Sequence, residues 1–177
     1  YFDTSGANPY GAVNSRLYRD SNSWMHIVWQ VDALNTTQRI WVNGQEESLT
    51  SSNNPPNYAY SMNQSGKVVG LGVAAWGGSH TNGIYLAEVH HSDGYKYDPS
   101  YYGYTDPQTG IWRPKKVTDI SYGVNGFYLD FSDNSAATAA ALGKDRSGNG
   151  NDWTPNGSIS VANDSTNDSS FDTPTNN

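Results

Sequence analysis

The sequence predicts an all-β protein, and three observations support that class. Gly and Tyr are frequent, with 18 and 13 copies in 177 residues, which is typical of aromatic-rich strands joined by glycine-containing turns. At least six segments alternate apolar and polar residues or form short apolar runs, as strands do. Only residues 134–143 suit a short helix. These observations favour a β-sandwich, with a β-barrel as the alternative.

The clearest strands lie in the segment from residue 24 to residue 50. WMHIVWQVD, at 24–32, places an apolar side chain at every second position, so one face of its strand is continuously apolar. RIWVNGQEE follows, and its Asn43-Gly44 pair suits a type I′ turn because both residues tolerate positive φ. We therefore expect a three-stranded meander at about 24–32, 38–42 and 45–50.

The rest of the chain is less regular. The Pro-Pro pair predicts an exposed loop at 51–65, and a Tyr, Gly and Pro-rich texture predicts an ordered loop rather than sheet at 94–116. Further strands are expected at 67–75, 83–93, 125–133 and 157–163. The expected organisation is an N-terminal segment at 1–18, interpreted as the remnant of a longer chain, a sandwich domain at 19–160, and a polar tail or linker at 161–177.

Charge and composition exclude several classes of partner. The net charge is -7 and the ten basic residues are scattered, so a nucleic acid is not an expected partner. No apolar run is long enough to span a bilayer, so membrane insertion is not expected. The absence of cysteine excludes disulfides and thiolate metal sites.

Two motifs in order resemble a known sandwich family. SWMHIVWQVDALNTTQRIWVNGQE, followed later by GIYLAEVHHSDG, resembles the concanavalin A-like, or laminin G-like, domains. The Trp-x-His strand, the Arg-Ile-x-Val-Asn-Gly hairpin and the later Ala-Glu-Val strand match that family in order and spacing. The resemblance implies a concanavalin A-like (jelly-roll) β-sandwich with long irregular loops.

The C-terminal half resembles a narrower group. DPSYYGYTDPQTGIWRPKK, YGVNGFYLDFSDNS, LGKDRSGNGNDWTPN and DTPTNN are similar to segments of sandwich-bearing virion proteins of tailed bacteriophages, especially marine ones. This resemblance implies a non-enzymatic structural protein of the extracellular virion, in a fibre, the tail or the capsid surface. Its partners would be other virion proteins or copies of itself in a homo-oligomer, and a host glycan bound during host attachment. The alternatives are a secreted or cell-surface bacterial carbohydrate-binding adhesion module, and a glycoside hydrolase of the concanavalin A-like class.

The chain offers weak candidates for catalysis. A glycosidase needs two carboxylates across a cleft, but the odd separation of Glu88 and Asp93 places them on opposite faces of a regular strand. The adjacent His90 and His91 point to opposite faces for the same reason, which argues against a shared zinc ion. We therefore expect no enzymatic activity, with Glu88 hydrogen-bonded inside the sandwich and His26 serving a packing role.

Aromatic residues in loops are the candidates for glycan binding. Trp and Tyr rings stack on the apolar face of a pyranose while amides and carboxylates bond its hydroxyls. The alternative is that these rings pin long loops onto the sandwich. The candidate glycan-binding residues are Trp76, Asn82, Tyr85, Tyr101 and Trp112.

KDRSGNGNDW, at 144–153, has the spacing of the first half of a calcium-binding loop. A helical calcium loop is excluded, because its twelfth position is Asn156 rather than Glu. Two interpretations remain: a calcium site on another scaffold, with Asp130 or Asp133 as further ligands, or a polar turn whose glycines supply positive φ. Calcium is the one cofactor considered, and its candidate ligands are Asp145, Asn149, Asn151 and Asp152.

Overall fold

The computed structural model describes residues 11–14, 16–20, 23–53, 69–71 and 85–156. The chain divides into two compact units, which are described separately. Unit 1 comprises Tyr1–His80 and Lys96–Ile120, and unit 2 comprises Thr81–Tyr95 and Ser121–Asn177. The regular elements of the described residues are β-strands and one 3-10 turn. The predicted all-β class is therefore confirmed.

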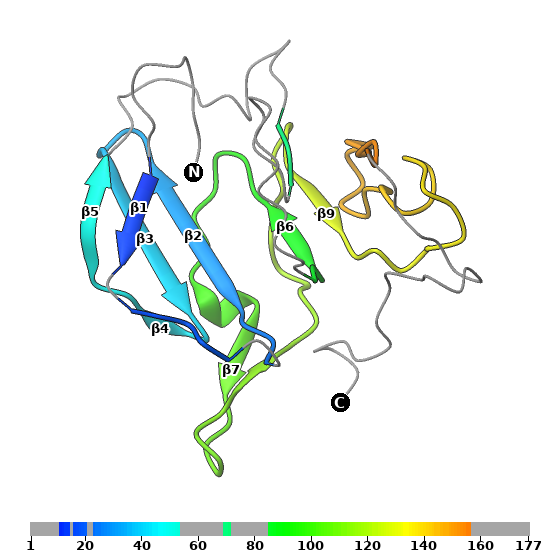
Figure 1. Cartoon of the computed structure of the whole chain (residues 1–177). Coiled ribbons are helices and arrows are strands. Elements are labelled where there is room, and N and C mark those ends of the chain that lie inside the picture. Colours follow the sequence, from blue (N-terminus) through cyan, green and yellow to red (C-terminus); the bar gives the residue numbers. More distant parts are fainter. Residues whose placement is uncertain (1–10, 15, 21–22, 54–68, 72–84, 157–177) are drawn as a thin grey trace. The chain divides into compact units, whose positions relative to one another are not determined.

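The central sheet of unit 1 is the predicted meander. β2 (Ile27–Asp32), β3 (Thr37–Val42) and β4 (Gln45–Glu46) form a three-stranded antiparallel sheet (Figure 1). Asn43 and Gly44 join β3 to β4 with φ values of 48° and 75°, as a type I′ turn requires. Trp41 and Val42 are buried, so β3 supplies core side chains.

A second pair of strands in unit 1 was not expected. β1 (Gly11–Asn14) pairs antiparallel with β5 (Leu49–Asn53), so part of the predicted N-terminal segment belongs to a sheet. The exposed loop predicted at 51–65 is wrong for 51–53, which lie in β5, and its remainder is outside the described residues. Backbone pairing with β1 satisfies the ladder bonds of these polar residues, whatever their side chains.

The segment 96–120 contains a hairpin. The 3-10 turn η2 (Pro99–Tyr101) precedes β7 (Gly103–Thr105) and β8 (Trp112–Pro114), which pair antiparallel. The prediction of loop without sheet at 94–116 was therefore wrong. Asp106 closes the hairpin, because its carboxylate accepts bonds from the amides of Gln108 and Thr109 and pairs with Arg113.

Unit 2 is built on a short strand pair. β6 (Val89–His91) pairs antiparallel with β9 (Phe127–Leu129), and Phe127, Leu129 and Ala141 are buried. The strands predicted at 83–93 and 125–133 are present but shorter than expected. The strand predicted at 157–163 and most of that at 67–75 lie outside the described residues.

The helix predicted at 134–143 was wrong. This segment forms consecutive turns, with backbone bonds from Ala141 to Thr138 and from Gly143 to Thr138 rather than a repeating i to i−4 ladder. Gly143 packs against the Trp153 carbonyl so closely that a Cβ there would overlap it, and Trp153 N donates to Gly143 O at 2.8 Å. Tertiary contacts of the turn therefore override the helix propensity of its alanines.

Candidate functional site

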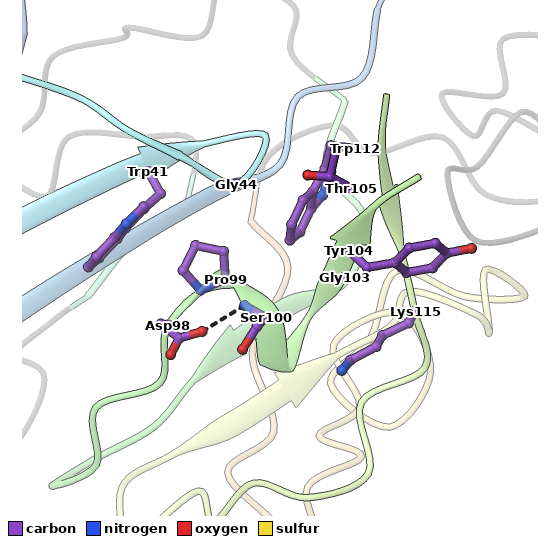
Figure 2. A pocket seen from close by; sticks show the side chains of 10 residues that line it. All are labelled: Trp41, Gly44, Asp98, Pro99, Ser100, Gly103, Tyr104, Thr105, Trp112 and Lys115. Carbon is purple, nitrogen blue, oxygen red and sulfur yellow. Dashed lines mark hydrogen bonds between the residues drawn. The ribbon is translucent and has the colours of Figure 1, made fainter. Parts of the chain in front are cut away.

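Unit 1 contains an open groove of about 590 Å³ beside the β3–β4 turn. Its walls come from that turn, from η2 and from the β7–β8 hairpin (Figure 2). Its volume lies within the range of small-ligand sites. The lining residues are Trp41, Gly44, Asp98, Pro99, Ser100, Gly103, Tyr104, Thr105, Trp112 and Lys115.

Two contacts with β2 hold the segment that carries most of these residues. Lys96 Nζ pairs with Asp32 Oδ2 at 2.7 Å, and Gln30 Nε2 donates to the Tyr97 carbonyl at 3.4 Å. Asp98 then caps η2 by accepting a bond from the Ser100 amide at 2.8 Å. These contacts set the start of the segment against the central sheet.

Trp112 lines the groove and packs against its neighbours. Its indole stacks on His26, with ring centroids 5.1 Å apart and planes at 25°. A Cβ on Gly44 or on Gly103 would lie 2.5 Å from the Trp112 ring, so both glycines permit its close approach. Trp112 therefore pins the hairpin onto the sheet, which favours the packing interpretation of this residue over direct stacking with a sugar.

His26 belongs to the same packing cluster. It also lies against Tyr102, at 5.8 Å between centroids, and its amide bonds the Asn43 side chain at 2.9 Å. Burial lowers the pKa of His26, so its ring favours the neutral form. These contacts agree with the packing role expected for this histidine.

Tyr104 is the most exposed aromatic residue of the lining. The residue is 50% exposed, and Figure 2 shows its ring pointing away from Trp41, Pro99 and Ser100. Trp41, by contrast, is buried, and the Arg39 guanidinium lies over its ring at 4.6 Å. Tyr104 therefore lines the groove next to its backbone, while its ring lies on the opposite side of the β7–β8 hairpin from Trp112.

The groove also carries one carboxylate and one ammonium group. Hydrogen bonds from Ser100, together with the nearby Arg39 and Lys115, lower the pKa of Asp98, so this carboxylate is ionised at neutral pH. Among the described residues, the Lys115 ammonium has no carboxylate within ion-pair distance. The lining thus offers both acceptors and donors of hydrogen bonds.

The structure separates the predicted glycan-binding residues. Trp112 lines the groove, whereas Tyr101 lies on η2 outside the lining, is 38% exposed and contacts Tyr97 edge-on. Tyr85 is 65% exposed in unit 2. Trp76 and Asn82 lie outside the described residues. Sequence reasoning missed Tyr104 and Lys115, although the turn-forming DPQTG at 106–110 could have indicated a hairpin that brings their strands together.

In unit 2, Asp145 is the centre of a hydrogen-bonded loop. The residue is 4% exposed. Its Oδ1 accepts bonds from the amides of Tyr128 and Ser147, and its Oδ2 accepts bonds from the Ser147 hydroxyl and the Asn151 amide, all at 2.8–2.9 Å. Burial alone raises the pKa of Asp145, but these bonds outweigh burial and hold the pKa below its usual range.

The other three predicted calcium ligands are also engaged. Asn149 and Asn151 each donate their amide group to two backbone carbonyls of the 123–126 segment, and Asp152 accepts from the Asp145 amide and from Lys144. Gly148 and Gly150 have φ of 94° and 77°. Among the described residues, no group of three or more His, Asp or Glu side chains is placed to hold a metal ion. This geometry favours the polar-turn interpretation over the calcium site.

The carboxylates considered for catalysis belong to different networks. Glu88 accepts a bond from the Tyr128 hydroxyl at 2.5 Å and lies 4.0 Å from His90 Nε2. Asp93 instead accepts bonds from the amide and side chain of Asn125. Burial and the Glu88 carboxylate raise the pKa of Tyr128. Glu88 is thus hydrogen-bonded within its unit, as expected, although its φ of 53° breaks the regular strand.

The two neighbouring histidines contact different surroundings. His90 stacks on Tyr128 at 4.2 Å and lies 2.8 Å from the Tyr122 hydroxyl through Nδ1. His91 packs against Phe127, at 5.4 Å between centroids. These separate contacts agree with the expectation that the two rings point to opposite faces.

Comparison of the chain with protein-family models, with curated proteins and with solved structures gave no match. In the part of the chain that the structure describes, no helix has the length and apolar character needed to cross a membrane.

Proposed function

We propose that this chain is a non-enzymatic structural module of a tailed-bacteriophage virion, in a fibre, the tail or the capsid surface, and that it binds host glycans. The groove of unit 1 is the observation that carries the glycan-binding part of this proposal. Its lining combines aromatic residues, hydroxyl groups, a carboxylate and an ammonium group, which are the residue types that commonly contact sugars.

The virion assignment has separate support. It rests on the resemblance of residues 93–177 to virion proteins and on a Gly-rich, Tyr-rich composition with strands in both units. The resemblance further suggests a concanavalin A-like sandwich. An experimental structure of the full chain tests that arrangement.

The non-enzymatic part is supported by the positions of the candidate carboxylates. Glu88 is bonded to Tyr128 and Asp93 to Asn125, so neither is presented as half of a catalytic pair. Activity against a panel of polysaccharides that is lost on Glu88→Gln would replace this proposal by the glycosidase alternative.

Mass spectrometry of purified virions tests the virion role. The expected result is peptides of this chain at a copy number constant from one preparation to the next. Their absence from virions, with recovery from bacterial surface fractions, would favour the adhesion-module alternative. Glycan binding is tested independently with the purified chain on an array of bacterial surface oligosaccharides.

A further inference from the structure

We infer that the outer face of the β7–β8 hairpin is a contact surface that binds unit 2 of a second copy of this chain. The inference rests on the proposed structural role, in which copies of the chain assemble. Two observations carry it: the exposed aromatic, aliphatic and basic side chains that a fixed hairpin presents, and the division of charge between the two units.

The outer face of the hairpin is the side opposite to Trp112. Successive side chains of a strand alternate between its two faces, and Trp112 packs inward against Gly44. The outer face therefore carries Tyr104 and Arg113, which pair across the two strands, and Ile111 beyond them.

These three side chains are presented to solvent by an ordered backbone. Ile111 continues the hairpin, because its carbonyl accepts a bond from the Asp106 amide at 2.9 Å, and it is 60% exposed. Tyr104 is half exposed, and the Arg113 side chain stays 44% exposed although it pairs with Asp106. Tyr and Arg are enriched among the residues that dominate protein interfaces. A partner that covers this face gains apolar burial with little loss of conformational freedom in the hairpin.

Two further cations follow the hairpin. Lys115 and Lys116 are exposed, and in the part of the chain that the structure describes neither ammonium group has a carboxylate within ion-pair distance. The Lys115 amide donates to the Tyr102 carbonyl at 2.9 Å, so its backbone is fixed. With Arg113 they place three of the ten basic residues within four positions, whereas the others are scattered. This surface therefore suits an acidic partner.

Unit 2 of another copy is such a partner. Unit 1 contains eight basic and eight acidic residues, whereas unit 2 contains two basic and nine acidic residues. Both cations of unit 2 are already paired within it, Lys144 with Asp152 at 3.1 Å and Arg146 with Asp130 at 3.6 Å. The net negative charge of the chain thus lies in unit 2, which attracts the cations of another molecule.

The two surfaces differ, so the contact is heterologous. A contact of this kind joins copies head to tail and gives a closed ring or an open filament, and either suits a repeating component of a fibre or tail. A symmetric contact of the hairpin face with itself would bring the cations of 113–116 from two copies together, which like-charge repulsion disfavours.

Sedimentation velocity of the full chain tests the contact over a series of protein concentrations, at low and at high salt. The expected result is association that grows with concentration at low salt and weakens as salt is raised, because salt screens exposed charges. A chain that is monomeric under all these conditions, or an association that salt does not affect, would overturn the inference. Neither outcome decides the virion role, which mass spectrometry of purified virions tests separately.

Zero-length cross-linking identifies the partner surface. A carbodiimide joins a lysine amine to a carboxylate that lies against it, and a mixture of unlabelled and heavy-isotope chains distinguishes links between copies from links within one copy. The expected result is mixed-isotope links from Lys115 or Lys116 to carboxylates of 85–95 or 121–156. Links confined to single-isotope pairs would assign these lysines to their own chain and overturn the contact between copies.

Two pairs of variants locate the surface. Tyr104→Ser should weaken association about tenfold, because an exposed ring at the contact is lost, whereas Tyr101→Ser, at an exposed ring on η2, should leave it unchanged. Lys115→Glu combined with Lys116→Glu should abolish association at low salt, whereas Arg19→Glu, at another exposed cation of unit 1, should not. Equal effects within either pair would contradict the assignment to the hairpin. Circular dichroism of each variant verifies that its fold is retained.

Discussion

Two turn-rich segments, one in each unit, are held in place by different kinds of interaction, apolar packing in one and hydrogen bonds in the other. In unit 1, the β7–β8 hairpin is fastened by an aromatic ring, because Trp112 packs on Gly44, Gly103 and His26. In unit 2, the segment 143–153 is fastened by a carboxylate, because Asp145 accepts four hydrogen bonds. Both segments are rich in residues that favour turns, so their local sequences alone do not distinguish them.

The two kinds of contact respond differently to substitution. Apolar packing is non-directional and its loss scales with the area removed. A carboxylate that serves several buried amides is directional, and its removal leaves each amide without a partner. The polar loop of unit 2 should therefore be more sensitive to a single substitution than the aromatic hairpin of unit 1.

Asp145→Ala should give the largest effect. It leaves the amides of Tyr128, Ser147 and Asn151 unbonded in a buried site, which should lower the free energy of unfolding of unit 2 by about 4 kcal/mol. Hydrogen exchange followed by mass spectrometry measures this, and peptides covering 127–129 and 145–151 should lose protection while those covering 37–42 keep it.

Asp133→Ala is the matched control. Asp133 also accepts bonds from a residue two positions on, Ser135, but it holds no amide from another segment in the contacts observed here. Its loss should leave exchange at 127–129 unchanged. Comparable effects of the two substitutions would show that the bonds to distant amides do not govern the loop.

Trp112→Ala should have the next largest effect. The residue is partly exposed, so the lost packing should cost about 2 kcal/mol rather than the larger value of a fully buried tryptophan. Urea denaturation and exchange of peptides covering 103–114 measure the change in unit 1. Ile111→Ala, at an exposed neighbouring residue, should change neither the stability of unit 1 nor the exchange of these peptides. An equal loss in both variants would show that the packing of the Trp112 indole is not what stabilises the hairpin.

Buried histidines give both units a similar, smaller dependence on pH. Burial lowers the pKa of His26 in unit 1 and of His91 in unit 2, the latter against the opposing influence of Asp93. A histidine with a lowered pKa binds fewer protons in the folded state, so its contribution is complete above the ordinary histidine pKa of about 6.5 and is lost as the pH falls below that value.

Each histidine should therefore contribute a slope of at most about 1.4 kcal/mol per pH unit below that value. Urea denaturation at a series of pH values, with exchange to assign each unit, measures the slope. His26→Phe should flatten it for unit 1 alone and His91→Phe for unit 2 alone. If the pH dependence of a unit's stability is unchanged after its histidine is replaced, other titrating groups cause that dependence.

Sequence reasoning succeeded where local patterns decide the structure. The meander of β2, β3 and β4 follows from local patterns, because alternation sets the strand faces and Asn43-Gly44 sets the turn. The glycines of 144–153 correctly indicated positive φ at Gly148 and Gly150. These features depend on residues close together in the chain.

Sequence reasoning failed where distant residues decide the structure. The alanine-rich 134–143 segment has helix propensity, but its turns are held against Trp153. The groove was missed because its lining residues come from β3, from the β3–β4 turn and from 98–115, and no local pattern brings Gly44 beside Trp112. The four acceptor contacts of Asp145 likewise join segments that are separated by up to 17 residues.

Calcium should have the smallest effect of all. All four lone-pair positions of the Asp145 carboxylate already accept hydrogen bonds, and Asn149 and Asn151 direct their amide groups to backbone carbonyls. A bound ion would have to break several of these bonds. A site filled at about 100 times its Kd would otherwise add about 2.7 kcal/mol to the stability of the folded state. We therefore expect the melting temperature in millimolar calcium to match that in chelator within about 1 °C, measured with the full chain and with magnesium as the ionic control. A rise of several degrees with calcium alone, abolished by Asp152→Asn, would instead establish a metal-binding loop. The segment 143–153 would then be held by a metal ion rather than by hydrogen bonds to Asp145 alone.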